Sequence, residues 1–300
     1  MKLSHETIKF PPGESLRLLQ WEDNVSNVTL LGTDGHTHPY EGAGATWHCH
    51  LEMELTLITR GSGTRNIGDC IQHFSAPDVL LIGPNLPHCW LGLKRSSGYA
   101  VQFLFGPDHP FWRIPETSSL QELFETARRG IHLSGKVAAR IIEEIEIMQT
   151  RDALGRLASL MTIFDIIKNA PAKERTLLSS KTFIPSPRQA VYRGMKKTID
   201  VVLNRFQENL TMAEMLRISG MSKATFARQF RKHTGRTFTH FLNEVRIDHA
   251  CRQLLDTEAS ISEIAYASGF ASLSHFNHCF HSLRHVSPRA YRRSKDSTSI

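Results

Sequence analysis

The sequence contains few cysteines and no long apolar run. Its five cysteines are scattered and form no CxxC pair, which excludes a disulfide framework and a thiolate zinc site. No apolar segment approaches the roughly 18 residues that a membrane-spanning helix needs, and the N-terminus lacks the pattern of a signal peptide. We therefore expect a cytoplasmic protein with reduced thiols and no membrane partner.

The charge is divided unequally along the 300 residues. Residues 1–187 carry 18 Lys and Arg against 20 Asp and Glu, whereas residues 188–300 carry 18 against 9, a net charge of +9. A basic domain attracts polyanions, because each neutralised phosphate releases a bound counterion. Nucleic acid is the expected partner, although basic surfaces also serve solubility or contact anionic membranes.

The N-terminal third reads as short strands and the next part as helices. Strands are predicted over 28–31, 54–59, 79–82 and 99–105, separated by the turn clusters GAGA, RGSG and GPNLP. Helical periodicity follows, with apolar stripes at Val137, Ile141, Ile145 and Met148 and at Leu154, Leu157, Met161 and Phe164. These helices either pair with a second chain in a homodimer, which we favour, or cover the sheet.

We therefore predict an α+β multidomain chain. Residues 1–115 form an antiparallel barrel or sandwich, residues 116–170 a helical dimerisation or cover segment, and the polar, Pro-punctuated residues 171–188 a linker. Residues 189–295 form a second, all-α domain.

The second domain contains a repeat of roughly 50 residues, over 211–235 and 260–285. Each copy has an N-cap candidate (Thr211 or Ser262), a short amphipathic helix, a Ser-Gly-apolar turn and a second helix capped by Ser222 or Ser272. A Gly with positive φ closes two helices tightly. The pattern predicts two helix-turn-helix units.

The second helix of each copy is expected to face DNA. Phe226 and Phe230 in copy one, and Phe276 and Phe280 in copy two, form the buried side. The predicted DNA-binding residues on the other faces are Ser222, Lys223, Ala224, Thr225, Ala227, Arg228, Arg231, Lys232, Ser272, Ser274, His275, Asn277, His278 and His281. Arg228 can donate two hydrogen bonds to guanine. The second helix of copy two is nearly uncharged, so we expect it to recognise the DNA sequence through hydrogen bonds and the shape of the DNA. The alternative is that these are solvated faces of a helical bundle.

The stretch from residue 241 to SPRAYRR resembles AraC/XylS-type transcriptional regulators over about residues 189–293. The pattern falls in one register at Arg246, Ala250, Leu254, Leu255, Ile261, Ile264, Ala265, Gly269, Phe270, Phe276, Phe280, Pro288, Tyr291 and Arg292. The resemblance implies two helix-turn-helix units joined by a long helix over about 239–255, and double-stranded DNA and RNA polymerase as partners. His278 and His281 stand where such proteins usually carry Arg or Lys, and His285 where Gly usually follows.

A second group of candidate site residues lies in the segment WHCHLEMELTL. His48, His50, Glu52, Glu54 and Thr56 alternate with apolar residues, so in a strand they share one face. His88, in the segment GPNLPHCW, supplies a third imidazole. Three imidazoles and a carboxylate are a ligand set for Fe, Mn, Ni or Zn.

The spacing of Gly42, His48, His50, Glu54 and Gly61 resembles the first motif of cupin barrels, and the region to His88 resembles the second, with Asn85 where Gly is common. In cupin enzymes the residues matching His48, His50, Glu54 and His88 hold a metal. In AraC-type sensor domains the pocket usually binds a small effector, of carbohydrate type by analogy. The predicted effector contacts are His48, His50, Glu54, Arg60, His88 and Trp90.

Three interpretations of this polar face stay open: a metal-free effector pocket, which we favour, a metal site, or a structural hydrogen-bonded face. The predicted function is a non-enzymatic transcription regulator that responds to a small molecule. The alternatives are a metal-dependent cupin enzyme fused to a DNA-binding module and a constitutive DNA-binding protein whose barrel only dimerises.

Overall fold

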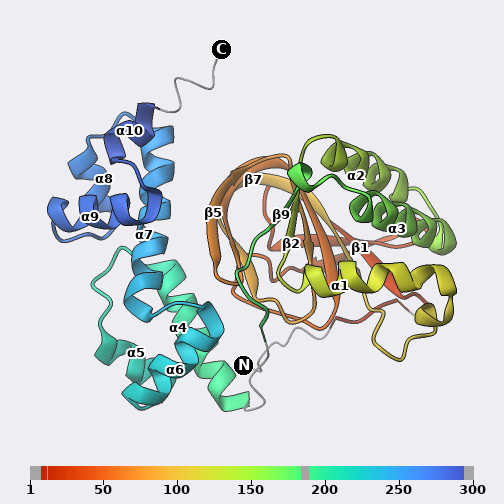
Figure 1. Cartoon of the computed structure of the whole chain (residues 1–300), viewed down its shortest axis with the longest axis horizontal. Coiled ribbons are helices and arrows are strands. Elements are labelled where there is room, and N and C mark those ends of the chain that lie inside the picture. The colour runs from red at the N-terminus through yellow and green to blue at the C-terminus, as the bar shows by residue number, and fades with distance from the viewer. Residues whose placement is uncertain (1–7, 12, 184–188, 294–300) are drawn as a thin grey trace. The chain divides into compact units, whose positions relative to one another are not determined.

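The computed structural model describes residues 8–11, 13–183 and 189–293 (Figure 1). The chain divides into two compact units: residues 1–70 and 74–185 form the N-terminal unit, and residues 71–73 and 186–300 the C-terminal unit. Within the described parts of the chain, every helix is too short or too polar to cross a membrane.

The N-terminal unit is built on one nine-stranded sheet. Its order is β3-β2-β1-β7-β4-β6-β8-β9, all in antiparallel pairs, with β5 paired to β4. The strands are β1 (Leu16–Trp21), β2 (Asn27–Leu31), β3 (Thr37–Glu41), β4 (Met53–Ile67), β5 (Cys70–Ser75), β6 (Asp78–Ile82), β7 (His88–Phe103), β8 (Ile131–Leu133) and β9 (Arg175–Leu177). Three of the predicted strands lie within β2, β4 and β6, and the fourth, over 99–105, overlaps β7 but runs two residues beyond its end.

The predicted turn at RGSG is wrong. Residues 60–63 continue β4, which pairs with β7 from Met53 to Ile67 through register shifts between Ile58 and Thr64. Gly61 has a φ of 104° and belongs to this irregular stretch. Glycine accommodates a bulge that bends a strand as readily as it closes a hairpin, and the sequence does not distinguish the two.

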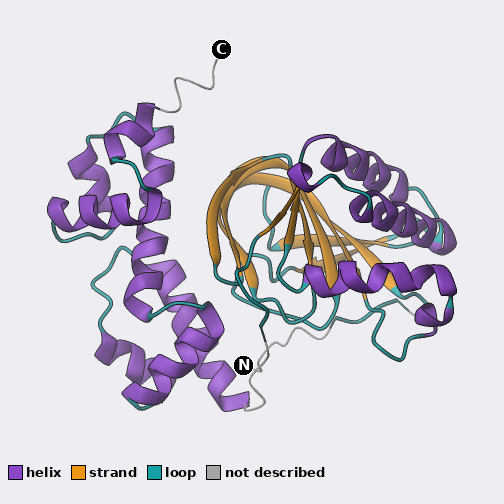
Figure 2. Ribbon diagram, viewed as in Figure 1, coloured by secondary structure: helices purple, strands orange, loops and turns teal. Residues whose placement is uncertain are grey.

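The sheet curves strongly (Figure 2) but its pairing does not close. β3 and β9 end the strand order, and no pair joins them among the described strands. The cupin-like barrel predicted from the motif spacing is therefore not confirmed, and an open, curved antiparallel sheet stands in its place.

The two faces of the sheet differ. Leu55 and Leu57 of β4 belong to a core that the sheet shares with the helices of this unit. Glu54 and Thr56, at the alternate positions, line a cavity on the other face together with Leu19. The period-2 alternation predicted for this strand is therefore confirmed from residue 53 onward.

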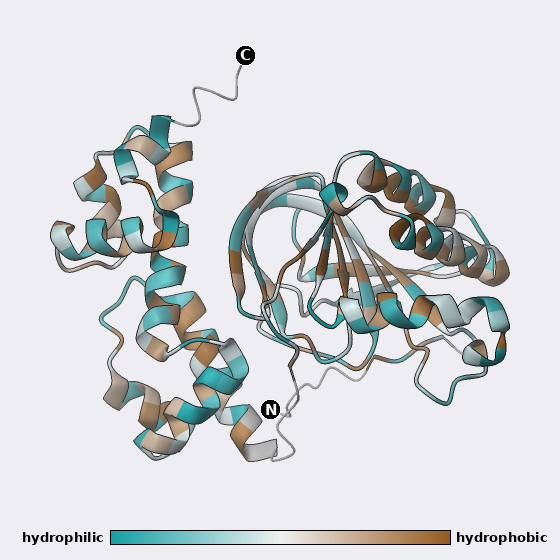
Figure 3. Ribbon diagram, viewed as in Figure 1, coloured by the Kyte–Doolittle hydropathy of each residue, from teal (hydrophilic) through white to brown (hydrophobic). Residues whose placement is uncertain are grey.

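Three helices cover the first face of the sheet (Figure 1), brown, hydrophobic residues recur along them (Figure 3), and their buried apolar residues share one core with the strands. They are α1 (Gln121–Ala127), α2 (Gly135–Met148) and α3 (Ala153–Lys168); short 3₁₀ helices lie at Pro110–Arg113, Pro115–Leu120 and Ala172–Glu174. The stripe predicted for α2 is buried.

The stripe predicted for α3 is partly wrong. Leu154 is 75% exposed, whereas Leu160, Ile163 and Ile167 are fully buried. Because α3 is apolar on several sides, its periodicity alone does not identify the face that contacts the sheet.

The predicted linker over 171–188 is wrong for its described part, residues 171–183. Strand β9 pairs with β8, and Phe183 is buried in the sheet's second core. Asp69 accepts hydrogen bonds from the Ser179 hydroxyl (2.9 Å) and the Ser180 amide (2.8 Å). A strand of three residues is too short to show a period-2 alternation in the sequence. β9 forms because it pairs with β8, which lies far away along the chain.

The C-terminal unit is all helical, as predicted, and begins its first helix at residue 189. The helices are α4 (Gln189–Arg205), α5 (Met212–Ser219), α6 (Lys223–Thr234), α7 (Phe238–Asp256), α8 (Ile261–Ala267), α9 (Leu273–Arg284) and α10 (Pro288–Arg293). Helix α7 contacts α4 and α6 on one side and α8, α9 and α10 on the other. It joins two small bundles, as the predicted long helix over 239–255 requires.

Candidate nucleic-acid interface and buried histidine cluster

The first helix-turn-helix unit consists of α5 and α6. The Thr211 hydroxyl caps α5 by accepting from the Glu214 amide, and the Ser222 hydroxyl caps α6 by accepting from the Thr225 amide. Gly220 lies between them in the left-handed conformation, with a φ of 65°. These local contacts confirm the predicted caps and turn.

The second unit consists of α8 and α9. Ser272 caps α9 as predicted, but the cap of α8 is Ser260, which forms a capping box with Glu263. The prediction of Ser262 is wrong, because the box needs an acidic residue three positions after the cap. His285 ends α9 with a φ of 59°, so histidine adopts the left-handed conformation for which glycine is usual.

The predicted DNA-facing residues lie on the outer sides of α6 and α9. Phe226, Phe230, Phe276 and Phe280 are completely buried, which leaves the opposite faces to solvent. Except for Thr225, which is half-buried beside Ser222, all of the predicted residues are exposed; they are Ser222, Lys223, Ala224, Ala227, Arg228, Arg231, Lys232, Ser272, Ser274, His275, Asn277, His278 and His281.

The two faces differ in charge. Helix α6 presents Lys223, Arg228, Arg231 and Lys232, whereas the exposed face of α9 carries hydroxyl, amide and imidazole groups. Arg228 has no ion-pair partner in the described part of the chain, so its guanidinium is available to an external acceptor. One helix is suited to phosphates and guanine, and the other to hydrogen bonding with base edges.

Arg246 of α7 connects the two bundles. Its guanidinium donates to the carbonyl oxygens of Phe206 (2.7 Å) and Glu208 (2.9 Å) after α4, and it lies over the Phe270 ring. A residue that was identified only as part of a family pattern thus ties α4 to the turn of the second unit.

In the N-terminal unit, His48, His50 and His88 converge. One ring nitrogen from each lies within 4.8 Å of the others, and all three residues are buried. His48 and His88 face each other across an isolated antiparallel bridge. The predicted turn at Asn85 has a φ of 62°, and its amide donates to the His50 carbonyl. This local geometry brings His50 and His88 together.

The outer nitrogens of the three rings are held by backbone. The Nδ1 atoms lie 2.8 Å from Thr46 O for His48, 3.0 Å from Glu52 O for His50 and 2.8 Å from Leu86 O for His88. A carbonyl oxygen only accepts, so each Nδ1 carries the proton and each Nε2 of a neutral ring offers a lone pair. Metal-ligating histidines are usually oriented in this way.

Glu54 lies beside the cluster. Its Oε2 is 3.3 Å from His50 Nε2 and accepts from Gln102 Nε2 at 2.6 Å, while its Oε1 accepts from the Thr56 hydroxyl at 2.6 Å. Glu54 therefore contacts the imidazole of His50, whereas each of the three imidazoles lies close to the other two.

The electrostatics of the cluster suit a cation. Burial and the neighbouring His88 and His50 lower the pKa of His48 well below its usual value, and burial lowers the pKa of His88 to about 4. Burial alone would raise the pKa of Glu54, but His50, His88 and Thr56 hold it below its usual range. At neutral pH, uncharged His48 and His88 rings thus adjoin a carboxylate.

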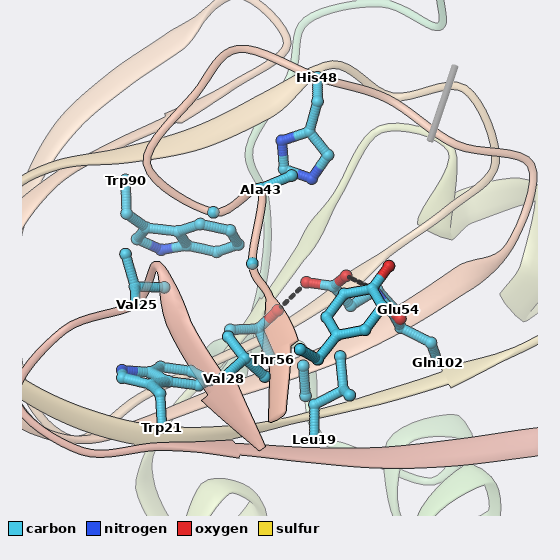
Figure 4. Close-up of a pocket in the computed structure, with 14 residues that line it drawn as sticks. Leu19, Trp21, Val25, Val28, Ala43, His48, Glu54, Thr56, Trp90 and Gln102 are labelled. Carbon is cyan, nitrogen blue, oxygen red and sulfur yellow. Dashed lines mark hydrogen bonds between the residues drawn. The ribbon is translucent and has the colours of Figure 1, made fainter. Parts of the chain in front are cut away.

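A cavity of about 40 Å³ adjoins the cluster (Figure 4). It is lined by His48, Glu54, Thr56, Trp90 and Gln102 among other residues. It is far smaller than the roughly 300–1,000 Å³ of pockets for drug-sized ligands, and holds about three water-sized groups. In this form it accommodates a ligand of a few heavy atoms, and a carbohydrate would need it to enlarge.

Two predicted effector contacts have different outcomes. Trp90 lines the cavity, and its buried indole N–H has no hydrogen-bond partner among the described residues. Arg60 lies outside the cavity: its exposed guanidinium pairs with Asp23 at 2.7 Å and with the Ser97 hydroxyl at 3.0 Å. β4 continues past the predicted turn and carries Arg60 away from the cavity, so this geometry does not support the predicted effector contact.

Sequence reasoning missed Gln102 and Arg17. Gln102 lines the cavity, and its side-chain oxygen accepts from Arg17 Nε at 2.7 Å. The available signal was a polar residue among apolar ones in each of two strands, Arg17 in LRLLQW, which also contains Gln20, and Gln102 in YAVQF. Such a residue marks a buried hydrogen-bonding position only once the facing strand is known.

Comparison with known proteins places the resemblance in the C-terminal unit. Residues 215–294 match the helix-turn-helix domain family. The HTH-type transcriptional regulator GlxA of Rhizobium meliloti is 37% identical over 108 residues, covering 36% of this chain and 31% of that protein. An uncharacterized HTH-type transcriptional regulator of Staphylococcus aureus is 30% identical over 105 residues, covering 35% of this chain and 14% of that protein. The chain thus matches less than a third of the length of these relatives.

Solved structures match different shares of the chain. The DNA-binding domain of AdpA in complex with a target DNA is 26% identical and covers 35% of this chain and 96% of that chain, with a TM-score of 0.34. ToxT from Vibrio cholerae O395 is 14% identical and covers 93% of this chain and 98% of that chain, with a TM-score of 0.35.

Proposed function

The C-terminal unit is an AraC-type helix-turn-helix domain, and from this premise we propose that the chain is a sequence-specific, double-stranded-DNA-binding transcription regulator. The observation that carries the proposal is the pair of capped, solvent-facing helices α6 and α9, which follow matched glycine turns around the shared helix α7. Residues 188–300 also carry a net charge of +9, which suits a phosphate backbone.

The two recognition helices, α6 and α9, make different contacts with DNA. Arg228 reads a guanine edge while Lys232 contacts phosphate, so α6 supplies most of the electrostatic affinity. Asn277 of α9 matches the donor and acceptor of adenine in the major groove. Successive major-groove faces lie one helical turn apart, roughly 34 Å, and we expect two half-sites with that spacing.

The N-terminal unit is the proposed sensor, and the histidine cluster its ligand site. His88 Nε2 is buried without a hydrogen-bond partner among the described residues, and burying an unsatisfied polar atom costs free energy. His48, His50, His88 and the nearby Glu54 fit a divalent metal such as Fe, Mn, Ni or Zn, each offering a nitrogen or oxygen ligand. The bound cation would supply the missing partner and cross-link β4, the start of β7 and the segment before β4.

Sensing requires that the ligand bind one arrangement of the protein more tightly than another. The segment over 178–183 is tied to the turn between β4 and β5 by Asp69, and the Gly68 amide donates to Pro87 O, next to His88. The chain leading to the DNA-binding domain is thus connected to the ligand site by backbone and buried polar contacts. A homodimer formed through α2 and α3, where Ile147 and Leu154 are exposed, stays a prediction.

The test selects duplexes from a random pool on the full-length protein, with and without Fe²⁺, Mn²⁺, Ni²⁺ or Zn²⁺. We expect one enriched sequence with two half-sites and an affinity that changes with one of these metals. The His48→Ala/His88→Ala variant should bind the same sequence without the metal response. The matched control is His36→Ala/His38→Ala, which removes two exposed histidines of the same unit.

The outcomes separate the two parts of the proposal. Equal affinity for enriched and scrambled duplexes overturns sequence-specific recognition. A metal response that survives in His48→Ala/His88→Ala overturns the sensor site and leaves the DNA-binding function intact.

A further inference from the structure

A row of buried polar side chains crosses three neighbouring strands beside the histidine cluster. Gln102 of β7 stands directly opposite Arg17 of β1 on one side and Glu54 of β4 on the other. All three are nearly inaccessible to solvent. Their side chains continue the row: Arg17 Nε donates to Gln102 Oε1 at 2.7 Å, and Gln102 Nε2 donates to Glu54 Oε2 at 2.6 Å.

The direction of these hydrogen bonds is determined at the Arg17 end. A guanidinium has donors only, so it requires the oxygen of the Gln102 amide to face it. The amide NH₂ must then face Glu54, where it donates to the carboxylate. With the amide reversed, its NH₂ would face the guanidinium and its oxygen would face the carboxylate, so both contacts would be repulsive.

Arg17 is itself held in place. Its guanidinium lies 4.5 Å from the centre of the Tyr40 ring and donates to the Tyr40 hydroxyl and to Lys9 O, both at 3.3 Å. At the other end of the row, the Thr56 hydroxyl occupies Glu54 Oε1. Oε2, which receives the Gln102 hydrogen bond, is the oxygen 3.3 Å from His50 Nε2.

We propose that Arg17 is a positioning residue for the histidine cluster: by orienting the Gln102 amide, it holds the Glu54 carboxylate beside His50 as an oxygen ligand for a divalent cation. This inference rests on the proposed function, since it assumes that the cluster binds metal. Arg17 does not line the cavity and acts only through Gln102. Hydrogen-bond partners of metal ligands typically change metal affinity about 10- to 100-fold.

The experiment titrates full-length protein with Co²⁺, whose visible absorption depends on the number and type of its ligands. The wild-type chain, Arg17→Met, Arg17→Lys, Gln102→Met and the double variant Arg17→Met/Gln102→Met are compared. We expect Arg17→Met to bind about 10- to 100-fold more weakly with an altered spectrum, and Arg17→Lys, which keeps a donor, to recover part of both. The double variant should lose no more than Gln102→Met, because the two residues act in series.

The matched control is Arg156→Met. Arg156 is a buried arginine of the same unit whose guanidinium donates to the backbone oxygens of Leu31 and Gly32, away from the cavity. It should reduce stability and leave the Co²⁺ affinity and spectrum unchanged. If Arg17→Met does not fold, Gln102→Met and Arg17→Lys carry the same comparison.

The outcomes distinguish this inference from the proposed function. A wild-type chain that binds no Co²⁺, or binds it equally after His48→Ala/His88→Ala, overturns this inference together with the metal-sensing part of the proposed function, and leaves the DNA-binding part intact. Wild-type binding at the cluster, with Arg17→Met unchanged or with additive losses in the double variant, overturns the role of Arg17 alone.

Discussion

The backbones of His48 and His88 bond to each other in both directions: the His48 amide donates to His88 O at 3.2 Å and the His88 amide to His48 O at 2.8 Å. The ring centroids are consequently 4.2 Å apart. Residues forty positions apart in the sequence therefore owe their proximity to one bridge between a loop and the start of β7. The cluster depends on the contacts that hold this bridge, as well as on the imidazoles.

The hydrogen bonds that Asp69 accepts lead to a prediction for residues 178–183, which we call the strap. Asp69→Ala removes the acceptor for the Ser179 hydroxyl and the Ser180 amide, so we expect trypsin to cut after Lys181 faster than in the wild type. In the same variant, the dependence of DNA affinity on metal should weaken while metal binding itself persists. Asp34→Ala, on the surface of the same unit, is the control. An unchanged cleavage rate in Asp69→Ala would contradict the strap.

Recognition by α6 is tested with two of its exposed cations. Arg228→Ala should reduce affinity for the selected duplex by about 1–3 kcal/mol and relax preference at one base pair, whereas Lys232→Ala should weaken all sequences similarly and reduce the salt dependence. Binding isotherms on selected and scrambled duplexes at several salt concentrations measure both effects. Equal losses on the two duplexes for Arg228→Ala would show that it contacts phosphate only.

The two helix-turn-helix glycines should respond differently to alanine. Both have positive φ, 65° at Gly220 and 86° at Gly269. A Cβ at Gly220 meets nothing within 4 Å, but at Gly269 it would lie 2.7 Å from the Phe206 backbone oxygen. We expect Gly220→Ala to cost about 1 kcal/mol of unfolding free energy from backbone strain alone, and Gly269→Ala to cost more.

Urea unfolding followed by far-ultraviolet circular dichroism compares the two glycine variants. Because the Gly269 clash involves the segment after α4, Gly269→Ala should also loosen the contact between the bundles. Equal costs at the two positions would show that the Phe206 backbone moves aside freely.

The C-terminal unit should lose stability in acid through His233. Burial, with a contribution from Lys232, lowers the pKa of His233 from 6.5 to about 4. Between these values the unfolded chain binds more protons than the folded one, so the stabilisation is complete above pH 6.5 and is lost as the pH falls toward 4. The full effect is on the order of 3 kcal/mol.

Hydrogen exchange of the α6 amides, corrected for the intrinsic rate at each pH, measures this loss. His233→Gln should flatten the dependence on pH, whereas His240→Gln, at an exposed position of α7, should leave it unchanged. An identical pH dependence in His233→Gln and the wild type would assign the acid sensitivity to other groups, such as His249, whose pKa burial also lowers to about 4.

Local signals account for what was predicted correctly in the C-terminal unit. The caps at Thr211, Ser222 and Ser272 and the turns at Gly220 and Gly269 depend on residues within a few positions of one another, and the buried phenylalanines follow the helical period. Such short-range interactions are encoded where they act. The single wrong cap, Ser262 instead of Ser260, was an error of two positions within the same motif.

In the N-terminal unit, the sequence by itself determined which residue types would meet: the alternation in β4 and the spacing of His48, His50 and His88 identified the cluster. Only the tertiary structure decided that β4 passes through RGSG, that residues 175–177 join the sheet, that Arg60 lies outside the cavity and that Arg17 reaches Glu54 through Gln102. The physical reason is that strand pairing is non-local. A strand's partners, and hence the neighbours of each buried polar side chain, come from segments tens of residues away and leave no periodic trace in the strand itself.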